Sequence, residues 1–429
     1  MTYQNDSLNI LMISLHGYIA SEPELGKPDT GGQVSFVLDL AKRFTRLGHS
    51  VDVVTRQFED QENIEEINPN LRIRRIPFGG KEFIRKEDMH DHISDFVTNL
   101  LAIIRKGNQG YDVINSHYWD AGWAGQRISE QLEIPHIHTP HSLGWWKREE
   151  MKHKQGKIEG QYRFEERINK EYRIYSSCEH IIATTEEQKE IIEKHYDVNE
   201  KHITILPPGI DESRFYPVPK DTVLSLRKKF DMTSHDILLL GRLADNKGYD
   251  LFIKAIPYLR KTIEEFRVLF ALGGNDDERD DKFIDYLKEM AQKEGVSQFI
   301  EWREFIEEDN LPKIYQAAKV FVLPSRYEPF GMVATEAIAC GTPSVITRHG
   351  ALHKNLIFGQ HALFADPEAP QELAMMVSLL MKYEDLSQEI SREGSRFVRR
   401  KYGWTGIAQA TLDLFKSMIH IRRFESMEI

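Results

Sequence analysis

The stretch that decides the fold spans residues 237–256 and reads ILLLGRLADNKGYDLFIKAI. It opens with consecutive apolar residues, which is typical of a buried strand. Beyond a glycine-containing loop, apolar side chains recur at Leu251, Phe252, Ala255 and Ile256, which is the spacing of an amphipathic helix. A strand, a loop and a helix in this order predict one unit of a doubly wound α/β domain.

The same alternation continues in both directions from this stretch. Short apolar runs precede helix-length amphipathic segments at residues 9–13, 51–54, 73–76, 111–114 and 181–183, and again at 267–270, 320–323 and 344–346. A chain of 429 residues also exceeds what one hydrophobic core usually serves. We therefore expect the α/β fold class, with two Rossmann-like, doubly wound domains and a cleft between them.

The boundary between the two domains is predicted within residues 205–211. Pro207, Pro208 and Gly209 cannot continue a helix or a central strand. This boundary gives an N-terminal domain over residues 1–208 and a C-terminal domain over residues 209–405. The remaining residues, 406–429, have the pattern of a helix that packs back on one of the domains, and the N-terminal domain is one candidate.

The composition excludes several classes of function. The net charge of −11 argues against a general nucleic-acid binder, so any phosphate site must be a local basic cluster. Two cysteines, Cys178 and Cys340, do not make a disulfide framework. The first residues lack a signal pattern, and no run approaches the roughly 18 apolar residues of a membrane span. We expect a cytoplasmic protein without a nucleic-acid partner or an integral membrane segment.

Two cations occupy the loop within the deciding stretch. Arg242 and Lys247 can converge on one diphosphate, Arg242 through its planar fork and Lys247 as a point charge. The alternative is a solvated pair of loop charges. Two glutamates in residues 325–336 support the ligand interpretation, because this segment also follows an apolar run.

Of these glutamates, Glu328 is predicted in the loop and Glu336 in a helix that opens near Gly331. Carboxylates in these places can accept bidentate hydrogen bonds from the vicinal hydroxyls of a sugar or ribose. The alternatives are a helix-capping role for Glu328 and a surface role for Glu336.

Adjacent glycines occur after the first predicted strand. Gly31 and Gly32 let the backbone approach a ligand closely, and the helix expected after them points free N–H groups at an anion. A tight turn without a ligand is an equally good interpretation of these two residues alone. The segment lacks the G-x-G-x-x-G pattern of dinucleotide-binding folds, which disfavours an NAD-dependent oxidoreductase.

Taken together, these segments resemble a known family. Residues 29–33, the turn at 141–144, the Arg242 and Lys247 loop and the Glu328 and Glu336 pair occur in the order found in the retaining nucleotide-sugar glycosyltransferases of family four. The resemblance covers essentially the whole chain and implies the GT-B architecture, in which two Rossmann-like domains face an interdomain cleft. A catalytically silent relative is disfavoured because the matching residues are all present.

Within this family, residues 14–18, 114–122, 325–328 and 404–408 are most similar to the branch that makes mannosylfructose phosphate. That similarity implies GDP-mannose as donor and fructose 6-phosphate as acceptor. The alternatives are sucrose phosphate synthesis from UDP- or ADP-glucose, and mannosyl transfer to glucosyl-3-phosphoglycerate. One departure is residues 349–351, His-Gly-Ala, where the relatives carry two glycines, which leaves the fit of the donor against this loop open.

The resemblance also implies a role for each matching residue on the donor side. Arg242 and Lys247 would bind the donor diphosphate, Glu336 the ribose and Glu328 the hexose hydroxyls. Backbone N–H groups near Phe330 and Gly331 would assist, together with Gly31 and Gly32. From the first domain, His141 would contact the hexose and the reacting centre, although a lone histidine after a strand is more often structural.

On the acceptor side, the resemblance implies that the phosphate is bound by Lys86, Lys147 and Arg167, with Gly32 and Gln33 near the acceptor sugar. Each of the three cations taken singly is otherwise interpreted as a solvated surface charge. Family members retain the anomeric configuration by front-side attack, with the nucleotide sugar as co-substrate and no obligatory metal or other cofactor. The acidic run at residues 275–281 is interpreted as a solvated loop.

Overall fold

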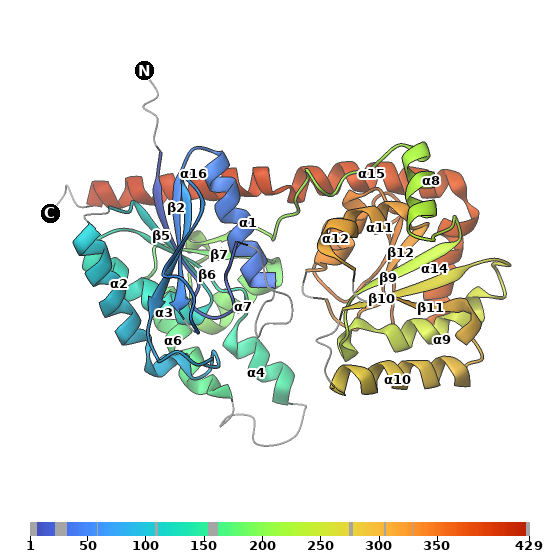
Figure 1. The fold of residues 1–429 in the computed structure, drawn as a ribbon, viewed down its shortest axis with the longest axis horizontal. Coiled ribbons are helices and arrows are strands. Elements are labelled where there is room, and N and C mark those ends of the chain that lie inside the picture. Colours follow the sequence, from blue (N-terminus) through green and yellow to red (C-terminus); the bar gives the residue numbers. More distant parts are fainter. Residues whose placement is uncertain are drawn as a thin grey trace. The chain divides into compact units, whose positions relative to one another are not determined.

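The computed structural model describes residues 7–21, 32–57, 59–107, 110–152, 162–273, 278–303, 306–328 and 330–425. The chain divides into two compact units (Figure 1). The first contains residues 1–208 and 404–429, and the second contains residues 209–403.

An eight-stranded sheet forms the centre of the first unit, in the order β3-β4-β2-β1-β5-β6-β7-β8. All neighbouring strands are parallel except β3 and β4. The strands are β1 (Asn9–Ile13), β2 (Ser50–Gln57), β3 (Ile64–Asn68), β4 (Leu71–Pro77), β5 (Val113–His117), β6 (His136–Thr139), β7 (His180–Ala183) and β8 (Ile203–Ile205).

Helices cover both faces of this sheet. They are α1 (Gly32–Arg46), α2 (Ile93–Gly107), α3 (Trp119–Leu132), α4 (Gly144–Lys152), α6 (Phe164–Ser177), α7 (Glu186–Tyr196) and α16 (Trp404–Glu425). Alternation along β1 separates two cores, because Leu11 and Ile13 face helices α2, α3 and α6, whereas Ile10 and Met12 face α1 and α16. The sheet is therefore buried on both sides, as parallel sheets require.

The second unit contains a six-stranded parallel sheet in the order β11-β10-β9-β12-β13-β14. Its strands are β9 (Asp236–Arg242), β10 (Arg267–Gly273), β11 (Ile300–Arg303), β12 (Val320–Leu323), β13 (Ser344–Thr347) and β14 (Leu363–Ala365). The deciding stretch thus forms the central strand β9 and the helix that follows it, as the sequence predicts.

Two helical layers flank the second sheet. The helices are α8 (Lys220–Lys229), α9 (Tyr249–Leu259), α10 (Glu278–Lys293), α11 (Leu311–Ala317), α12 (Met332–Ala339), α13 (Leu352–Asn355), α14 (Pro370–Lys382) and α15 (Glu384–Tyr402). Ile237 and Leu239 of β9 pack with α9 and α14, and Leu238 packs with α11 and α12. Short 3-10 turns lie at η1 (Met89–Asp91), η2 (Glu200–His202), η3 (Asp245–Lys247), η4 (Ser297–Phe299) and η5 (Glu308–Asn310).

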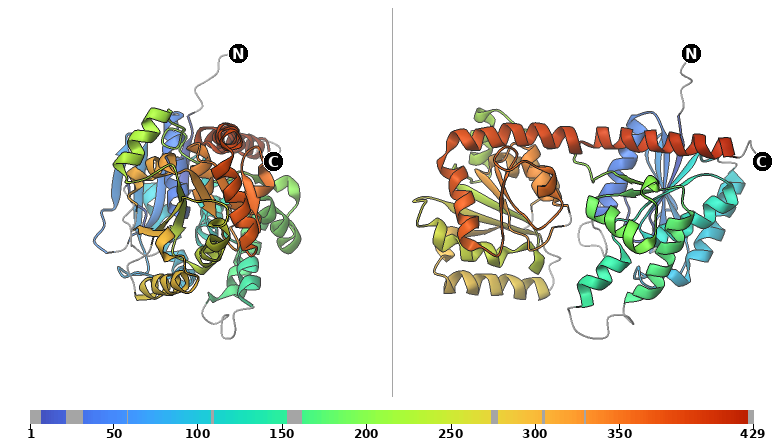
Figure 2. Two further views of the ribbon diagram at one scale, coloured as in Figure 1. Left: turned by 90° about the vertical axis from the view of Figure 1, so that its right-hand side faces the viewer. Right: turned by 180° about the vertical axis from the view of Figure 1, so that it is seen from behind.

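The last helix, α16, packs on the first unit, beside α1 (Figures 1 and 2). The Trp404 and Phe36 rings lie 5.1 Å apart, and the Phe415 and Phe44 rings lie 5.7 Å apart. Trp404 is already buried in this core, so the second unit ends at residue 403. The sequence analysis placed the end of the second domain two residues later, at residue 405. Among the described helices, none is both long and apolar enough to cross a membrane.

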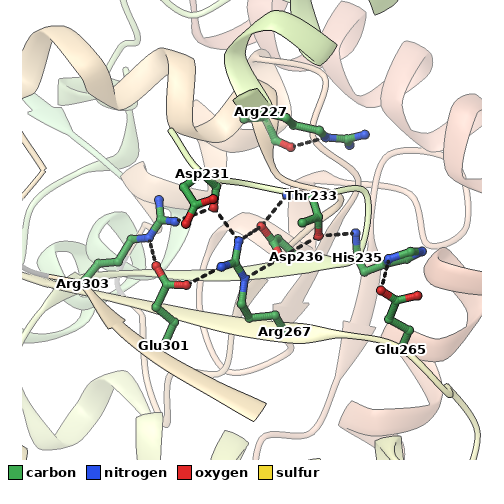
Figure 3. Close-up of polar contacts among 10 residues, drawn as sticks. Arg227, Asp231, Thr233, His235, Asp236, Glu265, Arg267, Glu301 and Arg303 are labelled. Carbon is green, nitrogen blue, oxygen red and sulfur yellow. Dashed lines mark hydrogen bonds and ion pairs between the residues drawn. The ribbon is translucent and has the colours of Figure 1, made fainter. Parts of the chain in front are cut away.

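A closed network of ion pairs lies at the amino ends of strands in the second sheet (Figure 3). The buried Asp236 accepts two hydrogen bonds from Arg267, at 3.0 and 2.8 Å, and further ones from Thr233. Arg267 also donates to Glu301 at 2.6 Å, and Glu301 accepts from Arg303 at 2.6 Å. These charges are satisfied by one another, so no charge of this network is left for a ligand.

Candidate active site

The loop that follows β9 presents the two cations predicted to bind a diphosphate. β9 ends at Arg242, the turn η3 ends at Lys247, and α9 starts at Tyr249. Between the last two lies Gly248, with φ +70° and an ideal Cβ position only 2.0 Å from the carbonyl oxygen of Pro324. Only glycine fits there, so the loop is held tightly against the end of β12.

Lys247 and Glu328 meet at this edge of the sheet. The Lys247 ammonium donates to Glu328 Oε2 at 2.6 Å, and Ser325 Oγ donates to the same oxygen at 3.2 Å. The two charged side chains are only 13% and 12% exposed. Residues 81 positions apart in the sequence therefore form one part-buried polar centre, as expected for a ligand site at the carboxyl ends of parallel strands.

Arg242, by contrast, is exposed, and its guanidinium has no hydrogen-bond or ion-pair partner among the described residues. Its backbone oxygen accepts from the Tyr249 hydroxyl at 3.4 Å. A cation without an internal partner, next to a part-buried lysine, is suited to an external anion.

The backbone of Glu328 is fixed by the loop after β13. Its N–H donates to the carbonyl of His349 at 2.9 Å, and a Cβ at Gly350 would lie 2.2 Å from the Glu328 carbonyl oxygen. Glycine is thus required at position 350. Ala351 has an ordinary helical φ of −80°, so alanine in place of the second glycine of the relatives causes no backbone strain.

The predicted opening of a helix near Gly331 is confirmed, because α12 begins at Met332 after Gly331 adopts φ +94°. Phe330 is buried, with its ring 5.4 Å from that of Tyr402. Glu336 lies in α12 and is half-buried, and the buried Tyr315 hydroxyl donates to its Oε2 at 3.0 Å. A fixed carboxylate of this kind can accept hydrogen bonds from a diol.

In the first unit, His141 follows β6 and adopts a left-handed backbone conformation with φ +58°. Its Nε2 lies 3.0 Å from Nδ1 of His117, and its ring packs edge-on against Phe36 with 4.9 Å between centroids. Burial lowers the pKa of His141 to about 3, with a further contribution from His16. The imidazole is therefore neutral near pH 7.

The start of α1 carries the predicted acceptor-side residues Gly32 and Gln33. The Gln33 amide donates to Ser14 Oγ at 3.1 Å and to the carbonyl of His117 at 3.4 Å. These contacts bring the start of α1 to the carboxyl ends of β1 and β5. Gly31 lies outside the described residues.

Arg167 is not a solvated surface charge, so that interpretation is wrong for this residue. It is 4% exposed and donates to Glu171 at 2.7 Å, to the Tyr118 hydroxyl at 3.0 Å and to the Ser142 carbonyl at 2.8 Å. The sequence could not show this, because Tyr118 is distant along the chain and the burial arises from tertiary packing.

Burial raises the pKa of the Tyr118 hydroxyl, and the positive charges of Arg167 and Lys86 act in the opposite direction. Arg167 lies over the Tyr118 ring, 4.8 Å from its centroid. Lys147 lies on α4, one turn after the 141–144 segment, with its ammonium 5.7 Å from the centroid of the Tyr162 ring. Its backbone N–H donates to the carbonyl of Leu143 at 3.0 Å.

The residue-level prediction omits two side chains that the structure places beside the predicted ones, His117 and Tyr118. Tyr118 has φ +78° and hydrogen-bonds to Arg167, and His117 contacts His141. Their signal in the sequence is a polar run, residues 115–118, that directly follows the apolar start of the buried strand β5. Buried polar residues of this kind require partners.

Comparisons with known proteins cover most of the chain. Residues 30–214 match the model of Glycosyltransferase Family 4, and residues 225–397 match the model of Glycosyl transferases group 1. The chain is 46% identical over 410 residues to mannosylfructose-phosphate synthase of Agrobacterium fabrum, covering 94% of this chain and 90% of that protein. The chain belongs to glycosyltransferase family four.

More distant relatives of this glycosyltransferase include a probable sucrose-phosphate synthase of Thermosipho melanesiensis, 29% identical over 91% of both chains. A D-inositol 3-phosphate glycosyltransferase of Xylanimonas cellulosilytica is 29% identical over 95% of this chain and 96% of that protein. Among solved structures, sucrose-phosphate synthase from Thermosynechococcus elongatus superposes with a TM-score of 0.78 at 24% identity, covering 96% of this chain and 100% of that one. The fold class is GT-B, as the sequence predicts.

Proposed function

We propose that this glycosyltransferase transfers mannose from GDP-mannose to fructose 6-phosphate, with retention of anomeric configuration, and so forms mannosylfructose phosphate. The observation that carries the proposal is the 46% identity to a mannosylfructose-phosphate synthase along 94% of the chain. A match that covers 94% of the chain includes parts of both units.

On the donor side, Arg242 and Lys247 bind the diphosphate and stabilise the negative charge that builds on it as the glycosidic bond breaks. Lys247 has three donor hydrogens, so it can keep its 2.6 Å contact with Glu328 while it binds a phosphate oxygen. Glu328 then accepts from hexose hydroxyls and Glu336 from the ribose. The backbone N–H groups of Phe330 and Gly331 assist in binding the same ligand.

On the acceptor side, Lys86, Lys147 and Arg167 provide the positive charge for the phosphate, with Gly32 and Gln33 near the sugar. Arg167 makes the smaller contribution, because its guanidinium is paired with the buried Glu171 and already donates to Tyr118 and Ser142. Lys86 and Lys147 supply the more adaptable ammonium contacts.

The reaction follows a front-side course. The acceptor hydroxyl attacks the anomeric carbon on the face from which the diphosphate departs, and the departing phosphate oxygen takes the acceptor proton. Arg242 and Lys247 provide the charge stabilisation that a metal ion supplies in other transferases, so neither a metal nor another cofactor is obligatory. His141 contacts the hexose as a neutral imidazole.

A donor-by-acceptor grid tests the proposal. GDP-mannose, UDP-glucose and ADP-glucose are each combined with fructose 6-phosphate, fructose and glucosyl-3-phosphoglycerate, with and without excess chelator. We expect the highest kcat/KM for GDP-mannose with fructose 6-phosphate, an α-linked product by NMR, and persistence in chelator. Faster turnover with UDP- or ADP-glucose would instead favour sucrose phosphate synthesis, the activity named for the Thermosipho relative.

A further inference from the structure

Two groups of histidines lie around β5, one on each face of the sheet. On one face, His141 Nε2 lies 3.0 Å from His117 Nδ1, beside Phe36 of α1. On the other face, Ser116 Oγ lies 2.8 Å from His138 Nδ1 and 2.6 Å from His136 Nε2. Ser116 and His117 come from β5, and His136 and His138 come from β6.

All four of these imidazoles are neutral near pH 7. The three strand histidines have exposed fractions of 1% or less. Burial lowers the pKa of His136 and His141 to about 3, and lowers the pKa values of His117 and His138 well below the ordinary range. A neutral imidazole carries one hydrogen on one of its two nitrogens. Along the contact between His117 and His141, one nitrogen therefore donates and the other accepts.

The second nitrogen of His117 decides the direction of this hydrogen bond. His117 Nε2 is fully buried and has no hydrogen-bond partner among the residues that the structure describes. A buried N–H without an acceptor is rare and costly, whereas a bare nitrogen lone pair in the same place is tolerated better. The hydrogen of His117 therefore lies on Nδ1 and is donated to Nε2 of His141.

We propose that His117 is a positioning residue that holds His141 in the neutral tautomer with its hydrogen on Nδ1. His141 then offers an N–H donor to the substrate, while its Nε2 lone pair is occupied and cannot take a proton from the acceptor hydroxyl. The inference deepens the proposed function, because it rests on His141 contacting the hexose.

Packing fixes the orientation of both rings. The Phe36 ring lies 4.9 Å from that of His141 and 5.8 Å from that of His117. The left-handed backbone of His141 after Pro140 further restricts where its side chain points. A further titratable ring near His141 is His16, whose Nδ1 lies 2.9 Å from Asp120 Oδ2, so the proposed tautomer does not depend on it.

Nitrogen NMR of the full chain labelled with ¹⁵N-histidine tests the tautomer without reference to activity. The His141 and His117 signals are assigned by their loss in His141→Asn and His117→Asn. At pH 7 we expect a protonated Nδ1 and an unprotonated Nε2 for His141. A protonated Nε2 on His141 would overturn the inference and leave the proposed transfer reaction untouched. Failure of the substrate grid would overturn the reaction and leave the NMR result standing.

Two variants of similar size test the consequence for turnover. In His117→Asn the amide nitrogen replaces Nδ1 and keeps a donor, whereas His117→Leu removes it. We expect His117→Leu to lower kcat by roughly tenfold, the scale of one lost hydrogen bond, with little change in donor KM, and His117→Asn to restore most of it. Equal losses in the two variants would contradict the inference.

His180→Asn is the matched control, because His180 is another buried histidine in the same sheet and bonds to Thr204 at 2.8 Å without contacting His141 in the described structure. Its kcat should be unchanged. Thermal unfolding of all three variants identifies any loss of fold. If His117→Leu does not fold, the NMR measurement on the native chain decides.

Discussion

The two ends of the second sheet carry similar charged side chains that are satisfied in different ways. At the amino ends, Asp236 is fully buried and held by a bidentate Arg267, which also pairs with Glu301. At the carboxyl ends, Lys247 shares a part-buried contact with Glu328, and Arg242 has no described partner. The number of ion pairs does not distinguish a structural cluster from a ligand site. The two are distinguished by whether a charged group remains available to a ligand.

The largest expected effect lies at the amino ends. Asp236→Ala removes the buried carboxylate that accepts hydrogen bonds from Arg267 and Thr233 and should lower the free energy of unfolding by about 3 kcal/mol, the upper end of the range for a hydrogen bond to a charged group. Urea denaturation measures this loss. The kcat of the folded enzyme should not change, because the network lies at the edge away from the site loops.

Glu265→Ala is the control from the same cluster (Figure 3). Its contact with His235 is 3.4 Å long, and the Glu265 side chain is 81% exposed, so its removal should leave stability nearly unchanged. A loss of turnover in Asp236→Ala without a loss of stability would contradict a purely structural role for the cluster at the amino ends.

The reverse pattern is expected at the carboxyl ends. Arg242→Ala and Lys247→Ala should each lower kcat on the order of a hundredfold, the scale of losing one preorganised donor to a developing anion. Thermal unfolding should stay close to that of the native chain for Arg242→Ala, since that side chain contacts no described partner. Lys254→Ala, an exposed lysine on α9, is the control. Near-normal turnover in both site variants would remove the diphosphate assignment.

A smaller effect is expected in the first unit. There Arg167 is hydrogen-bonded to Glu171, Tyr118 and Ser142, whereas Lys147 lies in α4. Lys147→Ala should raise the KM for fructose 6-phosphate about tenfold, the value of one charge-assisted hydrogen bond, and leave donor KM unchanged. The same variant should not affect the poor reaction with free fructose, and Lys106→Ala on α2 serves as control. An equal loss with both acceptors would show that Lys147 does not bind the phosphate.

Local sequence patterns predict the strands and helices of this molecule better than they predict which residues contact one another. The apolar run and the helical spacing of residues 237–256 suffice to predict β9 and α9. Gly248 and Gly331 occupy loop positions with positive φ, which favour glycine. The proximity of Lys247 and Glu328 also follows, because both lie after parallel strands of one sheet.

What could not be predicted depends on contacts across the sequence. The burial of Arg167 requires Tyr118, Ser142 and Glu171 to converge, and only the last is a near neighbour on the same helix. The partner of α16 is likewise decided by shape and not by its amphipathic pattern, which would suit any apolar surface.

The packing of α16 also sets the order in which the first unit can be completed during synthesis. Phe36 and Phe44 of α1 pack against Trp404 and Phe415 of α16, which are translated only after the whole second unit. At roughly 5–20 residues per second, the nascent first unit waits on the order of ten seconds with this apolar face of α1 open. The first unit, although its synthesis begins first, is therefore completed last.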